Sequence, residues 1–197
     1  RELLAYAAER HIEIIPEIEM PSHSEEVLAA YPELGCSGEP YKDSDFCVGN
    51  EEVFTFLQTV LDEVMELFPS EYIHIGGDEA GKAHWKTCPK CQQRMKDEGL
   101  KDVDELQSYM IRRIGEYVSW DEILDGGLAP GATVMSWRGT EGGIEAMSMG
   151  HDVIMSPGRY CYLDHTQDAP FREPESIGGY LPLDSVYDYE PIEKSMP

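Results

Sequence analysis

Basic residues are scarce in this chain. Its 197 residues include 15 Lys and Arg against 39 Asp and Glu, which gives a formal net charge of -24 at pH 7. A surface this acidic repels phosphate groups, so nucleic acid is a poor partner and anionic membranes are disfavoured. We therefore expect neither nucleic-acid binding nor membrane insertion.

Long hydrophobic runs, internal repeats and low-complexity segments are also lacking. No stretch reaches the roughly 18 consecutive apolar residues of a membrane span. The first residues, RELL, are typical of the middle of a helix and not of a signal peptide. A signal peptide that has been removed from the sequence is an open alternative. The composition, 41% hydrophobic and 27% charged, is that of a globular domain or part of one.

Cysteine is sparse, and the five residues are Cys36, Cys47, Cys88, Cys91 and Cys161. An odd number leaves at least one thiol unpaired within the chain. The first two flank a turn-rich loop and could form a disulfide, and the CPKC stretch at 88–91 could hold a local disulfide or half of a metal site. A zinc site that also uses His84 is weakly indicated, because a single CxxC lacks a second cysteine pair. We predict no metal.

Helical and strand patterns alternate along the chain. The clearest helix is predicted over 51–68, where apolar residues recur with the 3.6-residue period and Asn50 can cap the first turn. The other predicted elements are helices at 1–10, 103–117 and 141–149, and strands at 12–18, 72–75, 133–137 and 152–156. This alternation indicates parallel βα units, whose functional residues gather at the carboxyl ends of the strands.

Polar and aromatic residues follow these strands. They are the EMPSH stretch at 19–23, Asp78 and Glu79, the WDE stretch at 120–122, the WRG stretch at 137–139, and Tyr160, Tyr162 and Asp164. One strand end with polar residues is ordinary, but five in succession indicate an active site that is built from βα loops.

The adjacent acids Asp78 and Glu79 follow a short apolar run and two glycines. Gly76 and Gly77 let the backbone turn sharply and let a ligand approach. Two carboxylates in one cleft can acquire different pKa values and divide acid and base roles. The simpler alternative is that Asp78 caps a following helix and Glu79 lies in its first turn.

Aromatic residues at neighbouring strand ends favour a binding site. Trp120 and Trp137 lie beside charged residues, and sugars stack their apolar faces on such rings while carboxylates bind the hydroxyls. A lone tryptophan would be assigned to the core. Tyr162 and Asp164 share a face if the backbone is extended, although a surface turn is the simpler explanation. His74, inside a predicted strand, is expected to be a core histidine.

Five motifs in order, PEIEMPSHS, HIGGDEA, SWDEIL, VMSWRG and YCYLDH, resemble those of the family 20 glycoside hydrolases, the β-N-acetylhexosaminidases. The resemblance implies a (β/α)8 TIM barrel, an α/β fold of about 250 residues. Residues 1–197 would form a partial catalytic domain with about strands 3–7, while strands 1, 2 and 8 are missing from this chain. Compressed connections near 42–46 and 115–118 lead us to expect absent residues there.

The resemblance also implies catalytic roles. Glu79 would be the general acid/base, and Asp78 would orient and stabilise the 2-acetamido group of the substrate. The carbonyl oxygen of that group would attack the anomeric carbon, which is substrate-assisted hydrolysis with retention. His23 would form a hydrogen bond near the general acid and tune it.

Four further residues match substrate-binding positions of the family. Trp120 and Trp137 match walls of the acetamide pocket, Tyr162 a hydroxyl donor to the acetamide carbonyl, and Asp164 a ligand of sugar hydroxyls. Ser22 stands where relatives usually have glycine. The family's first-strand arginine, second-strand aspartate, and eighth-strand tryptophan and glutamate have no counterparts in this chain.

The predicted function is exo-acting removal of terminal β-linked N-acetylglucosamine or N-acetylgalactosamine from small glycans, without a cofactor. A secreted, periplasmic or cell-surface location is expected. One alternative is a non-catalytic glycan-binding relic of the same fold. A weaker one is a metal-dependent barrel hydrolase using His23, His74, Asp78 and Glu79.

Overall fold

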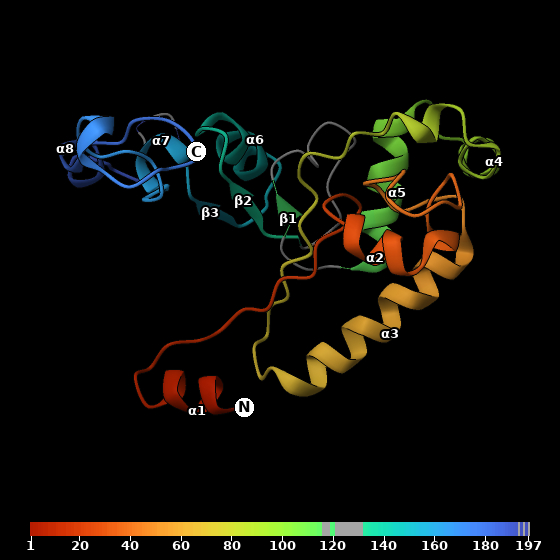
Figure 1. Ribbon diagram of the computed structural model, residues 1–197, viewed down its shortest axis with the longest axis horizontal. Coiled ribbons are helices and arrows are strands. Elements are labelled where there is room, and N and C mark those ends of the chain that lie inside the picture. The colour runs from red at the N-terminus through yellow and green to blue at the C-terminus, as the bar shows by residue number, and fades with distance from the viewer. Residues whose placement is uncertain (116–118, 121–131, 193, 195, 197) are drawn as a thin grey trace. The chain divides into compact units, whose positions relative to one another are not determined.

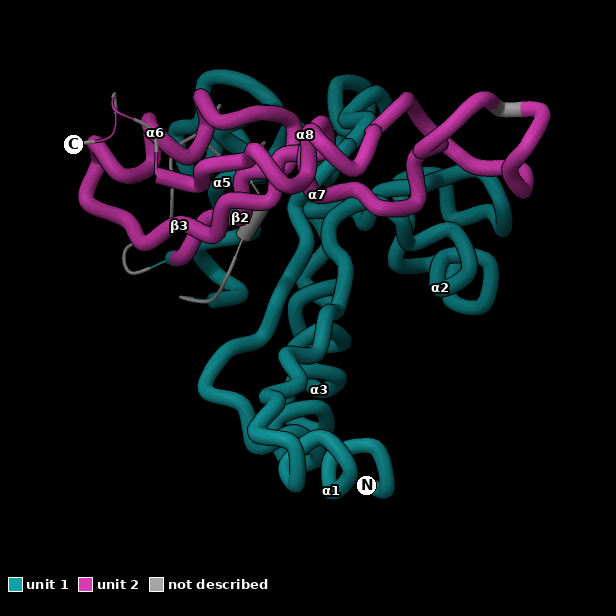
Figure 2. Tube along the Cα trace, turned by 90° about the vertical axis from the view of Figure 1, so that its left-hand side faces the viewer, with its two compact units in different colours: residues 1–132 teal, residues 133–197 magenta. Residues whose placement is uncertain are grey.

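The computed structural model describes residues 1–115, 119–120, 132–192, 194 and 196, and the chain divides into two compact units. Unit 1 is Arg1–Ala132 and unit 2 is Thr133–Pro197, coloured separately in Figure 2. Most of the expected gap at 115–118 and the loop after Trp120, including Glu122, lies outside the described residues, so those expectations stay predictions.

Unit 1 is mainly helical where it is described (Figure 1). Its elements are α1 (Glu2–Ala8), α2 (Glu25–Ala30), α3 (Glu51–Leu67), α4 (Pro89–Glu98), α5 (Val103–Ile114), 3-10 turns at Pro32–Leu34 and His84–Lys86, and the two-residue strand β1 (Ser119–Trp120). The helices predicted at 1–10, 51–68 and 103–117 correspond to α1, α3 and α5, whereas α2 and α4 were not expected. No helix within the described ranges is long and apolar enough to cross a membrane.

Helix α3 has the cap and the buried stripe that its sequence predicts. The Asn50 side chain accepts a hydrogen bond from the Glu52 N–H at 3.2 Å, and its amide donates to the Glu33 carbonyl at 2.9 Å. The side chains that α3 buries are Val53, Phe54, Leu57 and Leu61. The cap thus fixes both the start of α3 and its attachment to the preceding loop.

The predicted strands at 12–18 and 72–75 pair in parallel over a few residues only. The Ile18 N–H donates to the His74 carbonyl at 2.9 Å, and the His74 N–H donates to the Pro16 carbonyl at 2.9 Å. The strand prediction is wrong for 12–15, where Ile12 and Ile15 are exposed. Pro16 has no N–H to give to a ladder, so the pairing runs only toward the carboxyl end.

Trp85 is the largest fully buried side chain of the core of unit 1. Its indole N–H donates to the Phe46 carbonyl at 2.9 Å, so its polar atom is satisfied within the core. Helix α5 contributes Leu106, Met110 and Ile111 to the same core. Trp85 thus packs the segment after the acid pair onto the body of unit 1.

Unit 2 contains the predicted parallel βα unit. Strands β2 (Val134–Ser136) and β3 (Val153–Met155) pair in parallel, and α6 (Glu141–Ser148) connects them and packs against both (Figure 1). Gly143 permits this packing, because a Cβ there would press on Ser136, Val153 and Met155. The remaining described elements are α7 (Gly158–Cys161), a 3-10 turn at Pro170–Arg172 and α8 (Leu183–Tyr187).

We predict that Asn50→Ala in the full-length protein lowers the free energy of unfolding by about 1–2 kcal/mol, because both the cap and the bond to the Glu33 carbonyl are lost. Asn50→Asp keeps the acceptor for the Glu52 N–H and should recover part of that loss. Urea unfolding of the three proteins measures the difference. Equal stability of the alanine variant and the wild type would show that the cap contributes nothing.

Candidate active site

His23, Asp78 and Glu79, the three predicted catalytic residues, lie together in unit 1. The His23 Nε2 is 3.3 Å from a Glu79 carboxylate oxygen and 3.5 Å from an Asp78 carboxylate oxygen. The parallel pairing described above produces this arrangement, because the carboxyl ends of the two paired segments meet at one edge. A histidine and two carboxylates in contact can exchange protons with a bound substrate.

The backbone adopts left-handed conformations just after both of the paired segments. Gly76 and Gly77 have φ angles of 67° and 106°, and the non-glycine residues Glu79 and His23 have 50° and 48°. Such angles are uncommon outside glycine and cluster at functional sites. The helix-cap alternative for Asp78 is wrong, since the next helical turn begins only at His84.

The two acids occupy different environments. The Asp78 side chain is 17% exposed, whereas that of Glu79 is 59% exposed. The Asp78 Oδ1 is buried and has no hydrogen-bond partner among the described residues. A buried carboxylate oxygen needs a donor, and the neighbouring carboxyl group of Glu19 can be that donor. Asp78 therefore offers a fixed acceptor, and Glu79 an accessible proton carrier.

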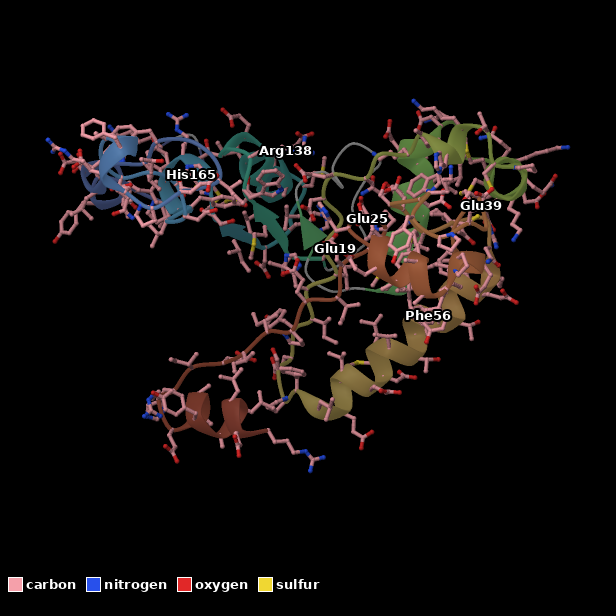
Figure 3. The ribbon with its side chains drawn as sticks, viewed as in Figure 1. Glu19, Glu25, Glu39, Phe56, Arg138 and His165 are labelled. Atoms are coloured by element: carbon pink, nitrogen blue, oxygen red, sulfur yellow. The ribbon has the colours of Figure 1, made fainter. Side chains whose placement is uncertain are left out.

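Glu19 is a site residue to which the sequence alone assigned no role. It lies on the extended segment that leads into α2, where Figure 3 labels it, and its Oε1 accepts from the Gly77 N–H at 3.1 Å. Burial, followed by the negative charge of Asp78, raises the pKa of Glu19 to about 9. Glu19 is therefore protonated at neutral pH and can donate a hydrogen bond to Asp78.

Gly76 lies directly against Glu19. A Cβ on Gly76 would overlap the Glu19 carboxyl group, so glycine is required both by the backbone angle and by space. The sequence showed only that Glu19 lies at the end of one predicted strand and that Gly76 lies at the end of another. Only the parallel register, with Glu17 opposite His74, shows that the two meet.

Two other polar side chains hold the loop of the acid pair. The buried Gln107 of α5 donates to the Gly77 carbonyl at 2.7 Å. Asp45 accepts from the N–H groups of Lys82 at 2.8 Å and Gly81 at 3.3 Å. Gln107 could have been found from sequence, because it lies four residues before Ile111 on the apolar stripe of α5.

His74 and His84, the other two histidines considered as metal ligands from the sequence, do not lie in the cluster formed by His23, Asp78 and Glu79. His74 accepts from the Gly76 N–H at 3.1 Å, and burial lowers its pKa, as expected of a neutral core histidine. His84 instead pairs with Asp43. Of the four residues considered for a metal-dependent hydrolase, His23, Asp78 and Glu79 therefore lie with their ligand atoms within 4.8 Å of one another, and His74 is not part of this group.

In unit 2, two predicted substrate-binding residues come together. The rings of Trp137 and Tyr162 stack with centroids 6.3 Å apart and planes 15° apart. The Gly158 N–H donates to the Trp137 carbonyl at 2.7 Å, which ties the end of β2 to the start of α7. Asp164 is exposed nearby in sequence. The Trp120 side chain lies outside the described residues.

A family model described as "Glycosyl hydrolase family 20, catalytic domain" matches residues 1–197. The chain is 51% identical to a β-hexosaminidase of Porphyromonas gingivalis and 37% identical to one of Vibrio furnissii, with 100% and 98% of the chain covered. It spans only 28% and 34% of the lengths of these two relatives.

Solved structures agree. A family 20 exo-β-N-acetylglucosaminidase of Vibrio harveyi in complex with N-acetylglucosamine matches with a TM-score of 0.84 at 30% identity, over 96% of this chain and 33% of that one. A β-N-acetylhexosaminidase of Bacteroides fragilis matches with a TM-score of 0.76 at 34% identity, over 85% and 37%. The fold is thus that of the α/β glycoside hydrolases. The chain belongs to glycosyl hydrolase family 20.

We predict that Gly76→Ala lowers both stability and kcat/KM of the full-length protein. The left-handed backbone angle costs about 1–2 kcal/mol for alanine, and the new methyl group displaces Glu19 from the Gly77 N–H. Gly38→Ala is the matched control, since Gly38 has a φ of 71° with open space around its Cβ position. If both variants lose activity equally, the contact with Glu19 is unimportant.

We also predict a pH-dependent effect of Glu19→Gln. Between pH 4.5 and about 9 the folded protein keeps a proton on Glu19 that the unfolded chain releases. The free energy of unfolding of the wild type therefore carries a contribution that falls as pH rises through this window. The variant lacks that contribution, so its stability relative to the wild type should rise with pH.

Urea unfolding at several pH values measures this difference in the full-length protein. Glu13→Gln removes one negative charge at an exposed position of the same segment and serves as the control. A difference between Glu19→Gln and the wild type that stays constant across the window would show that the Glu19 carboxyl group has an ordinary pKa.

Proposed function

We propose that the protein containing this chain is an exo-acting β-N-acetylhexosaminidase. It removes terminal β-linked N-acetylglucosamine or N-acetylgalactosamine from small glycans with retention, and the acetamido oxygen of the substrate is the nucleophile. The family match and the named relatives support this activity, and the related Vibrio harveyi structure contains N-acetylglucosamine. In the same proposal, the chain supplies about strands 3–7 of a (β/α)8 barrel.

The single observation that carries the proposal is the unequal pair of acids. The Asp78 side chain is only 17% exposed, and its carboxylate can accept the acetamido N–H of a substrate. That bond turns the acetamido oxygen toward the anomeric carbon. The negative charge of Asp78 then stabilises the positive charge that develops on the acetamido group as it attacks.

Glu79 supplies the proton transfers in this mechanism. Its exposed carboxyl group protonates the glycosidic oxygen as the bond to the leaving group breaks, and later takes a proton from the water that opens the cyclic intermediate. His23, 3.3 Å from Glu79 and 3.5 Å from Asp78, orients both carboxyl groups. One protein acid is sufficient because the substrate provides its own nucleophile.

The aromatic residues bind the sugar in this proposal. The stacked rings of Trp137 and Tyr162 form an apolar wall of the kind on which a sugar face or an acetamide methyl group packs. Trp120 is assigned a second wall, and Asp164 the sugar hydroxyls. Tyr162 is assigned the role of hydroxyl donor to the acetamido carbonyl.

The catalytic roles are tested with Glu79→Gln and Asp78→Asn in the full-length protein. With a poor leaving group, Glu79→Gln should lower kcat by about 10²–10⁴-fold, because general acid catalysis is lost. Asp78→Asn should lower kcat by about 10²–10³-fold on all β-N-acetylglucosaminides. Glu71→Gln, an exposed acid just before the same strand, is the control and should keep wild-type rates.

Two further measurements separate the rival functions. An aryl β-glucoside, which lacks the acetamido group, should not be turned over by the wild type, and azide should not rescue Asp78→Asn. Turnover of the glucoside, or azide rescue, would assign the nucleophile to the protein. Binding of N-acetylglucosamine by the wild type without turnover of any aryl β-N-acetylhexosaminide would establish the non-catalytic alternative.

A further inference from the structure

Four cysteines from two distant stretches of unit 1 converge on one point. They are Cys36, Cys47, Cys88 and Cys91, called the cysteine cluster below, and their sulfur atoms all lie within 4.8 Å of one another. All four thiols are free. The two disulfides considered from the sequence, Cys36–Cys47 and Cys88–Cys91, are therefore not formed. The CxxC stretch at 88–91 was a weak indication of a metal site because it lacked a second cysteine pair, and Cys36 and Cys47 are that second pair.

Three of the six sulfur–sulfur distances match the edge of a tetrahedron around one metal ion, and the others are within 4.8 Å. The Sγ–Sγ distances are 3.7 Å for Cys36–Cys91, Cys47–Cys88 and Cys47–Cys91. Four thiolates at the usual Zn–S distance of about 2.3 Å stand about 3.8 Å apart. Two disulfides would instead bring the sulfurs together in pairs at about 2.05 Å. The cluster thus has the geometry of a four-coordinate thiolate site.

The backbone around the cysteine cluster lets the two cysteine-bearing stretches come close to each other. Cys88 is the residue before α4, whose first position is Pro89, and Cys91 lies in the first turn, where the helix dipole favours thiolates. Gly49 lies against this turn, because a Cβ there would overlap the backbone of Lys90 and Cys91. The glycine therefore lets the Cys47 loop meet the CPKC turn.

Burial makes the cluster unstable as four ionised groups without a cation. Cys47 and Cys91 are fully buried, Cys88 is nearly so, and Cys36 is partly buried. Four thiolates this close together and this buried repel one another, whereas a divalent cation between them accommodates all four.

We propose that the cysteine cluster binds one structural Zn²⁺ ion. Four sulfur ligands in a tetrahedral arrangement suit zinc, and burial leaves no open position for a substrate, so the ion is not catalytic. It fastens the segment 36–47 to the start of α4. Because Asp45 on that segment holds the N–H groups of Gly81 and Lys82, the ion also steadies the loop that carries Glu79.

The metal content of the full-length protein tests this inference. The protein is purified without chelator or reductant, and its metals are measured by elemental mass spectrometry together with its free thiols. We expect one zinc per chain and no disulfide among the four cysteines. Cys47→Ser should lose the zinc, whereas Cys161→Ser, whose cysteine lies in unit 2 outside the cluster, should keep it.

A second measurement covers the case in which the Cys47 variant does not fold. Cobalt exchanged into the wild type should give the intense thiolate-to-cobalt absorption of a tetrahedral sulfur site. Chelation of zinc under denaturing conditions should raise the number of reactive thiols by four. Recovery of the four cysteines as two disulfides, or of iron in place of zinc, would overturn the proposal. Neither measurement depends on glycosidase activity.

Discussion

The short parallel pairing between residues 16–20 and 74–75 is the constraint on which the candidate active site depends. Only a few backbone hydrogen bonds form it, yet they place the end of one segment beside the end of the other. His23 follows the first segment and the acid pair follows the second, so a small register shift would separate them. Because side chains alternate along extended backbone, the register also decides which carboxyl group faces which glycine. The contact of Glu19 with Gly76 and Gly77 results from that register.

The geometry around the acid pair explains how two neighbouring carboxylates can have different roles. Asp78 is mostly buried and is backed by the Glu19 carboxyl group, which burial and the charge of Asp78 keep protonated at neutral pH. Glu79 is exposed to solvent on the other side of a left-handed turn. One acid is thus held in place as an acceptor, and the other is free to transfer protons. A pair of equally exposed acids would not provide this division.

The loop that carries Glu79 is fastened from several sides at once. Gln107 binds the carbonyl before the acid pair, and Asp45 binds the N–H groups after it. Trp85 buries the next turn in the core. The cysteine cluster joins the segment that bears Asp45 to the turn that follows Trp85. A zinc ion there would connect the segment that holds the N–H groups of this loop to the turn that follows it in the chain.

The sequence by itself determined the local elements and the site motifs. Helix α3 with its Asn50 cap, helix α5 and the β2–α6–β3 unit were predictable from the periodicity of hydrophobic residues, because helix and strand patterns consist of residues that are close together in the sequence. Asp78, Glu79 and His23 were identified by motif, and their convergence was then found. Only the tertiary structure decided the role of Glu19, the partner of His84 and the meeting of Cys36 and Cys47 with the CPKC turn. These depend on contacts between residues far apart in the chain, and no local pattern records which distant segments will be adjacent.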